Sequence, residues 1–326
     1  MSFERTVILP VDPDTAFALV TEPERLRRWQ TVACRLDLTV GGSYRFTMAP
    51  GHHAAGTVTE IDPGRRLVLS WGWEGSDAVP PGDSTLFITM EPHPQGTALT
   101  LRHEGLDAGQ SSGHAEGWNH FLDRLVRFAE TGHAAPDPWN ATPEPEDAIA
   151  SAEAALAALQ LVLHNLQAKD LQRPTPCAEY NVGQLVDHLA GNLAMACKAL
   201  GAELADDPSL APEPRIARLA QAALEAFSAR GLDGEIDLGF AVVPASVLSG
   251  ILNLEFMVHG WDFAQATSQQ YDVDPGLAEY ALDLARATVG EPQRASGSFG
   301  PETAIAESAG SLERLIAFTG RVPAGA

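Results

Sequence analysis

Hydrophobic and polar positions alternate with a period of two through the first part of the chain. The alternating runs cover residues 34–39, 42–48, 53–61, 66–72, 84–92 and 96–103. Turn sequences such as Asp62-Pro63-Gly64 separate them, and this pattern predicts an antiparallel sheet. A β-rich run at residues 5–9 precedes the sheet. Residues 12–29 predict one or two helices, with Asp14 as the expected cap.

The period changes to that of a helix over residues 112–131. One face of this segment is apolar and carries Trp118, Phe121, Leu122, Leu125 and Phe128. A sheet followed by one long helix is the order of a helix-grip fold, in which a curved sheet wraps the helix and leaves a cavity. We therefore expect residues 1–131 to form an α+β helix-grip domain.

The second part of the chain is predicted to be all-α. Residues 132–146 are rich in proline and predict a semi-rigid linker. Helical spacing then recurs over residues 147–169, 181–193, 214–230, 247–267 and 276–289, with a shorter segment at 311–318. Asn181 with Gln184 has the spacing of a capping box. These segments predict that residues 147–326 form a four-helix bundle with additions.

Composition narrows the classes of function. The chain has 326 residues and a formal charge of −22, which argues against nucleic acid or an anionic membrane as a partner. It has no apolar run long enough to cross a membrane and no signal-like start. Its cysteines, Cys34, Cys177 and Cys197, are few and scattered, so no disulfide framework is expected. We expect a cytoplasmic protein.

A candidate metal site lies on the helix predicted over residues 247–267. Glu255 and His259 are four residues apart and fall inside the apolar stripe, where a carboxylate is costly unless it is paired or metal-bound. His188, on another predicted helix, would complete a His/Glu/His set with an open position, as in catalytic zinc sites. Asp262 is placed to hold the second nitrogen of His259. The alternative is a Glu–His pair that satisfies itself within one helix.

The remaining candidates carry weaker signals. His164 is expected to be structural, and His52, His53, His114 and His120 show no ligand spacing. Cys177 lies in a proline-rich loop with only Arg173 as a basic neighbour, so a structural role is favoured over a nucleophilic one.

Two resemblances add to this interpretation. The segments RLRRWQT, GGSYRF, GTVTEIDPGRRLVLSWGW, TLFITMEP, GTALTLRHEGL and GHAEGWNHFLDRL resemble the START-like (SRPBCC) superfamily, in the branch named after the activator of the heat-shock-protein-ninety ATPase. The segments RPTPCAEYNVGQLVDHLAGN, LNLEFMVHGWDFA, SFGPE and LERLIAFTGR resemble an actinobacterial family of DinB-like metal-binding proteins, near the N-terminal domain of mycothiol-dependent maleylpyruvate isomerase. The second resemblance implies that His188, Glu255 and His259 bind a divalent metal, usually zinc.

The sequence therefore predicts a two-domain metalloprotein. The expected activity is a mycothiol-dependent transferase or isomerase that acts on a small electrophilic or apolar molecule, with the thiol implied by resemblance alone. The alternative is a non-catalytic protein that binds a small hydrophobic ligand and has a structural metal bundle. A role like that of chaperone activators is a weaker third hypothesis. The residue types also suit nickel, iron or cobalt, and the oligomeric state is open, with a homodimer as one possibility.

Overall fold

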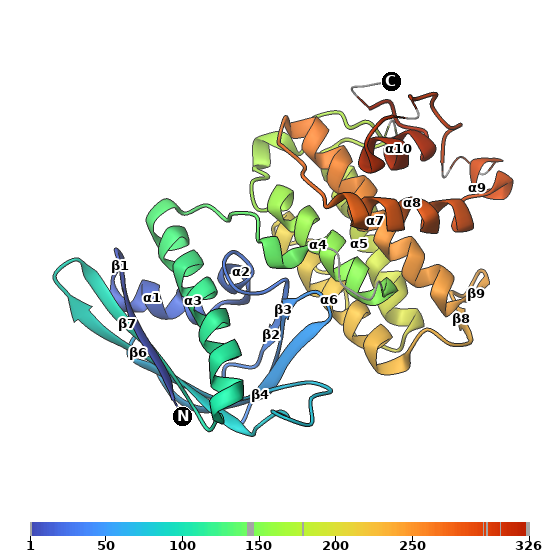
Figure 1. Ribbon diagram of the computed structural model, residues 1–326. Coiled ribbons are helices and arrows are strands. Elements are labelled where there is room, and N and C mark those ends of the chain that lie inside the picture. Colours follow the sequence, from blue (N-terminus) through green and yellow to red (C-terminus); the bar gives the residue numbers. More distant parts are fainter. Residues whose placement is uncertain are drawn as a thin grey trace. The chain divides into compact units, whose positions relative to one another are not determined.

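The computed structural model describes residues 2–141, 147–177, 179–295, 297, 299–306 and 308–323. The chain divides into two compact units, with the boundary between Ala135 and Pro136 (Figure 1). Residues 142–146, which belong to the predicted linker, lie outside the described residues.

The first unit is built on one seven-stranded antiparallel sheet. Its strands are β1 (Phe3–Leu9), β2 (Ala33–Leu36), β3 (Ser43–Ala49), β4 (His52–Asp62), β5 (Arg66–Trp73), β6 (Ser84–His93) and β7 (Gly96–Glu104). Their order in the sheet is β1-β7-β6-β5-β4-β3-β2, so β1 pairs with the last strand and the others follow as a meander. Each alternating run of the sequence corresponds to one of these strands.

Three helices belong to this unit: α1 (Pro13–Thr21), α2 (Pro23–Leu26) and α3 (Ala108–Thr131). The predicted cap at Asp14 is wrong. Asp12 caps α1, because Pro13 occupies the first turn and the Asp12 carboxylate accepts the backbone N–H of Thr15 at 3.0 Å. Helix α3 begins at Ala108, four residues before the predicted start, because Asp107 and Gln110 form a capping box.

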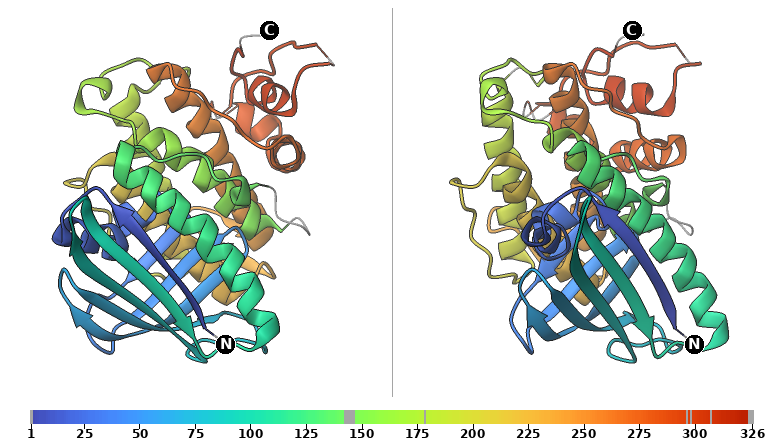
Figure 2. Two further views of the ribbon diagram at one scale, coloured as in Figure 1. Left: turned by 60° about the vertical axis from the view of Figure 1, so that its left-hand side comes forward. Right: turned by 90° about the vertical axis from the view of Figure 1, so that its left-hand side faces the viewer.

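Helix α3 lies along one face of the sheet (Figures 1 and 2). Trp118, Phe121, Leu122 and Leu125 of α3 are buried, as the sequence predicts. They pack with the inward residues of β3, β5, β6 and β7 in one hydrophobic cluster. The predicted α+β helix-grip fold is confirmed.

The second unit is helical. Its helices are α4 (Ala148–Leu163), α5 (Val182–Ala199), α6 (Pro212–Arg230), α7 (Ala245–Thr267), α8 (Pro275–Thr288), α9 (Glu291–Ala295) and α10 (Ser311–Phe318), with 3₁₀ turns η1 (Pro138–Asn140) and η2 (Ala168–Asp170). Helix α4 packs on α6 and α7, and α5 packs on the same two helices. The capping box of Asn181 and Gln184 starts α5, as predicted.

One β element in this unit departs from the all-α prediction. Strands β8 (Glu235–Asp237) and β9 (Val242–Pro244) form a short antiparallel hairpin before α7. Runs of three residues are too short to show a periodic signal, which explains why the sequence pattern missed them. Among the described residues, none of the helices has the length and apolar character needed to span a bilayer.

Candidate metal centre

Helices α5 and α7 bring the three predicted ligands together. His188 comes from α5, and Glu255 and His259 come from successive turns of α7. One ligand atom from each lies within 4.8 Å of the others, and no other such group of His, Cys, Asp or Glu side chains occurs among the described residues. The two imidazole rings stand perpendicular, with centroids 5.4 Å apart. Neither helix alone could assemble this set.

The spacing of the donor atoms suits a small divalent ion. Glu255 Oε2 lies 3.4 Å from His259 Nε2 and 3.9 Å from His188 Nε2. Two ligands with bonds of about 2.0–2.1 Å at a tetrahedral angle lie roughly 3.3–3.4 Å apart. The pair on α7 already has that separation, and His188 is about half an ångström further out.

The decisive atom is Oε2 of Glu255. It is buried and lies outside hydrogen-bond geometry, and Nε2 of His259 faces it at 3.4 Å as an ion pair. A buried carboxylate oxygen without a donor is costly. Because this oxygen lies near two imidazole nitrogens, positive charge fits it, either the proton of His259 or a metal ion that replaces this proton. The chemistry of the donor set therefore agrees with a metal site.

Asn192, one turn after His188 on α5, orients the carboxylate. Its amide nitrogen donates to Glu255 Oε1 at 3.1 Å, which leaves Oε2 directed at the imidazoles. The same nitrogen lies 3.2 Å from His188 Nε2. Sequence reasoning missed Asn192, although its position four residues after His188 places it on the same helical face.

Asp262 contacts Nδ1 of His259, and Arg321 in turn contacts Asp262. Nδ1 of His259 lies 3.0 Å from Asp262 Oδ2, the contact that the sequence predicts for Asp262. Arg321, which follows α10, donates to the same carboxylate from Nη2 at 2.9 Å and from Nε at 3.3 Å. Because Nδ1 is engaged by Asp262, Nε2 is the nitrogen of His259 available to a ligand. Periodicity did not indicate Arg321, which lies 59 residues from Asp262, but the segment LERLIAFTGR, one of those that carry the family resemblance, ends at this residue.

These contacts set the protonation of the centre. Burial by itself would lower the pKa of His259, but the carboxylates of Asp262 and Glu255 outweigh it and raise that pKa to about 9. Burial likewise opposes ionisation of Glu255, yet contact with His259 keeps the pKa of this carboxyl below its usual value. The pKa of His188 is lowered, chiefly by burial. A proton on His259 thus balances the carboxylates where a divalent cation would do the same.

The loop before α5 borders the centre. The ring of Tyr180 stacks on His188 with centroids 4.9 Å apart. Cys177 precedes it and is partly exposed, and burial is the main cause that raises the pKa of its thiol, with Arg321 opposing. Cys34 and Cys197 are buried, with pKa values raised to about 12 and about 11. None of the three thiols is activated, which agrees with a structural role for Cys177.

The other predicted residues stay outside the cluster. His164 is buried 3.9 Å from Glu213, in agreement with a structural role. A surface pocket of about 470 Å³ lies at the start of α5, but it contains none of the three ligands. Its two charged residues, Arg215 and Asp187, are paired with each other, and Arg215 also pairs with Asp206.

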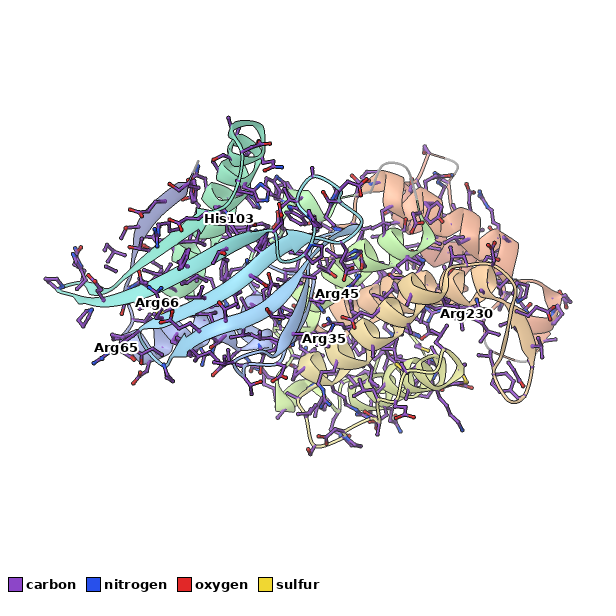
Figure 3. All side chains as sticks on the ribbon, turned by 90° about the horizontal axis from the view of Figure 1, so that it is seen from below. Arg35, Arg45, Arg65, Arg66, His103 and Arg230 are labelled. Carbon is purple, nitrogen blue, oxygen red and sulfur yellow. The ribbon has the colours of Figure 1, made fainter. Side chains whose placement is uncertain are left out.

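The first unit contains a buried polar chain. Trp118 donates to Nδ1 of His103, so the proton of His103 is on Nε2, which lies 2.9 Å from Ser84 Oγ. Ser84 in turn donates to the carbonyl of Trp71. Burial lowers the pKa of His103 to about 3, so this imidazole is neutral. His103 is on β7 and faces α3 (Figure 3), and its neutrality and fixed partners give it a structural role.

Comparison with known proteins assigns each unit to a family. Residues 10–130 match the family described as Activator of Hsp90 ATPase homolog 1-like protein (AHSA1), and residues 152–235 match the Mycothiol maleylpyruvate isomerase N-terminal domain. The first unit thus contains an AHSA1-like domain, and the second contains a domain of the mycothiol maleylpyruvate isomerase N-terminal type. Members of the second family are metal-binding and mycothiol-related. Of the three candidate ligands, only His188 lies within the matched residues. The assignment of Glu255 and His259 as candidate ligands therefore depends on the geometry of the cluster.

Individual relatives each match less than half of the chain. The chain is 32% identical over 165 residues to Uncharacterized protein Rv0738 of Mycobacterium tuberculosis, which covers 49% of this chain and 90% of that protein. The AHSA1-like protein RHE_CH02687 of Rhizobium etli, solved by NMR, is 38% identical, with a TM-score of 0.37 over 43% of this chain and 88% of that one. DynU16, from the dynemicin biosynthetic locus, is 26% identical, with a TM-score of 0.39, and the match spans 42% of this chain and 50% of DynU16.

Proposed function

We propose that the isomerase-type unit binds one zinc ion through His188, Glu255 and His259 and acts as a mycothiol-dependent transferase or isomerase on a small electrophilic molecule. The observation that supports the metal is the cluster of His188, Glu255 and His259, in which the buried Oε2 of Glu255 is outside hydrogen-bond geometry and lies near two imidazole nitrogens. Three protein ligands leave a further position for an exogenous group, as in catalytic zinc sites. The thiol is supported by the family of the second unit. A cytoplasmic location stays a prediction.

When bound, the cation would lower the pKa of a thiol and so supply a thiolate at neutral pH. The protein's own residues prepare this chemistry. Asn192 fixes the carboxylate of Glu255, and Asp262 fixes the ring of His259. Tyr180 covers one face of His188 and limits access of water to that ligand. The thiolate would then bond to an electrophilic carbon, with loss of a leaving group in transfer or with later release of the thiol in isomerisation.

The first test is the metal content of the purified protein. We expect about one zinc per chain by plasma mass spectrometry, and loss of zinc in His259→Ala and Glu255→Gln. His133→Ala is the matched control, because His133 is exposed and outside the cluster. Equal and negligible zinc in all four proteins, each folded by circular dichroism, would refute the metal site.

The second test concerns the reaction. Wild-type protein with zinc, mycothiol and a panel of electrophiles should yield thiol conjugates by mass spectrometry, and Glu255→Gln should not. Zinc at one per chain without any conjugate or isomerised product would reject the enzyme and favour the second candidate.

That second candidate is a non-catalytic protein that binds a small hydrophobic ligand in the AHSA1-like unit. The observation in its favour is the indole N–H of Trp71, which is buried and has no acceptor among the described residues. The rings of Tyr44, Trp73 and Trp118 surround it. A hydrophobic molecule with one hydrogen-bond acceptor would satisfy this group. In this case the zinc site is closed, so zinc should resist chelators, whereas a catalytic site should exchange it.

A further inference from the structure

The segment after α10 returns to α7 and places a buried guanidinium behind the candidate metal centre. Arg321 is only 9% exposed, and Asp262 is fully buried. The Nη2 and Nε atoms of Arg321 form a fork on the two oxygens of Asp262, and Nη1 donates to the carbonyl of Thr319 at 3.2 Å. The side chain is therefore fixed at both of its polar edges.

The segment is itself held in place by further contacts. Gly320 has φ +86°, and a Cβ there would lie 2.6 Å from the Cα of Gly300. Two segments of backbone therefore approach so closely that only glycine fits at residue 320. Arg294 donates to the carbonyls of Gly300 and Phe318. On the outer side, Arg314 of α10 pairs with Glu279 of α8. This packing holds Arg321 against Asp262 in one orientation.

From this geometry we infer that Arg321 is a positioning residue of the metal centre, acting on His259 through Asp262; the inference rests on the proposed zinc site. Asp262 Oδ2 accepts both from Arg321 Nη2 and from His259 Nδ1. The fork fixes the plane of the carboxylate, and the carboxylate fixes the ring so that Nε2 faces Glu255 Oε2. Arg321 also balances the charge of Asp262, which would otherwise be a buried carboxylate with only one partner.

Arginine suits this role better than lysine. A guanidinium offers paired donors in one plane, which matches a carboxylate, whereas an ammonium acts as a point charge. Arg321→Lys should therefore keep the charge balance but lose the orientation. Arg321→Met should lose both.

The test is zinc affinity, measured by competition with a chromophoric chelator on the full chain. Arg321→Met should bind zinc about 10–100-fold more weakly, the range typical for loss of a group that holds a ligand. Arg321→Lys should fall between Arg321→Met and the wild type, and it keeps the experiment informative if Arg321→Met fails to fold. The visible absorption of the Co²⁺ derivative should change in both variants, since it reports the geometry of the ligands.

Two controls separate positioning from general stability. Arg314→Met weakens the same C-terminal segment without touching Asp262, so it should leave zinc affinity and the Co²⁺ spectrum unchanged. In an Asp262→Asn background, Arg321→Met should have little further effect, because Arg321 acts through Asp262. An equal loss with Arg314→Met, an equal loss in the Asp262→Asn background, or unchanged affinity in Arg321→Met would overturn the inference. Absence of zinc from the wild type would instead reject the proposed function.

Discussion

A proton on His259 can offset the buried carboxylates of the candidate metal site while no metal is bound. Its imidazole lies between the carboxylates of Asp262 and Glu255, 3.0 Å and 3.4 Å away. With a pKa of about 9, it is protonated at neutral pH and offsets part of the charge of these two carboxylates. A cation that binds Nε2 must displace that proton. Metal binding and proton release are therefore the same event at this residue.

This exchange predicts that zinc affinity rises with pH between about 6.5 and 9. Below pH 9 each unit of pH increases the deprotonated, binding-competent form of His259 about tenfold, so affinity should rise by up to about tenfold per unit. The dependence should flatten above 9. Competition titrations with a chelator of known pH dependence measure it at intervals of one unit.

Asp262→Asn provides the comparison, because it removes one of the charges that raise the pKa of His259. Its pH profile should flatten at a lower pH than that of the wild type. A wild-type affinity that is constant from pH 6.5 to 9 would show that His259 does not give up a proton to the metal.

The sequence could identify four of the residues at this centre, the three candidate ligands and Asp262, but not Asn192 or Arg321. Glu255 and His259 are recognisable because a carboxylate and an imidazole at helical spacing interrupt an apolar stripe. His188 follows from its family motif. Asn192 and Arg321 contact Glu255 and Asp262 across 63 and 59 residues of chain, and such contacts depend on how helices pack. Periodicity carries no information about packing between helices.

At the scale of single elements, two glycines inside helices should respond in opposite directions to the same substitution. Gly260 of α7 faces Tyr271, and an added Cβ would lie 2.4 Å from its hydroxyl oxygen and 2.7 Å from the ring. Gly191 of α5 is exposed, with nothing within 4 Å of such an atom. Alanine normally favours a helix over glycine by about 1 kcal/mol.

Gly191→Ala should therefore stabilise the helical unit by roughly 0.5–1 kcal/mol, and Gly260→Ala should destabilise it by about 1–3 kcal/mol through overpacking. Urea unfolding followed by circular dichroism measures both. Tyr271→Phe added to Gly260→Ala should recover part of the loss, because it removes the nearest atom. Stabilisation by Gly260→Ala alone would mean that Tyr271 moves aside without cost.

The elements themselves were largely predictable from the chain. Every alternating run became a strand, and the capping box of Asn181 and Gln184 starts α5 as expected. One error is at a position where a local rule had two candidates. Asp12 and Asp14 both precede an apolar face, and the proline between them decides in favour of Asp12. The hairpin β8–β9 was missed because each of its strands has only three residues.

At the scale of the whole molecule, the two units should respond oppositely to pH. In the AHSA1-like unit, the pKa of His103 falls from 6.5 to about 3 on folding, chiefly by burial. The unfolded chain then binds a proton that the folded one excludes, so stability falls as pH drops below 6.5, by up to about 1.4 kcal/mol per unit. In the zinc-free helical unit, the pKa of His259 rises to about 9. Its contribution is complete below 6.5 and is lost as pH rises through 9.

The protein's own cysteines can report each unit separately. Cys34 is buried in the first unit and Cys197 in the second, so each thiol becomes reactive when its unit unfolds. Saturating pulses of a thiol reagent along a urea gradient, followed by peptide mass spectrometry, give one midpoint for each cysteine. Between pH 5 and 9, we expect the midpoint of Cys34 to rise and then level off above 6.5. That of Cys197 should fall above 6.5.

Two variants connect these slopes to their residues. His103→Gln should flatten the acid-side slope of Cys34 without changing that of Cys197, and His259→Gln should do the reverse on the alkaline side. Zinc should raise only the midpoint of Cys197, by an amount that grows with its free concentration. Equal urea midpoints for Cys34 and Cys197 at every pH would mean that the two units unfold together. In that case a ligand or metal bound to either unit would stabilise the whole chain, and binding in one half would be communicated to the other through stability.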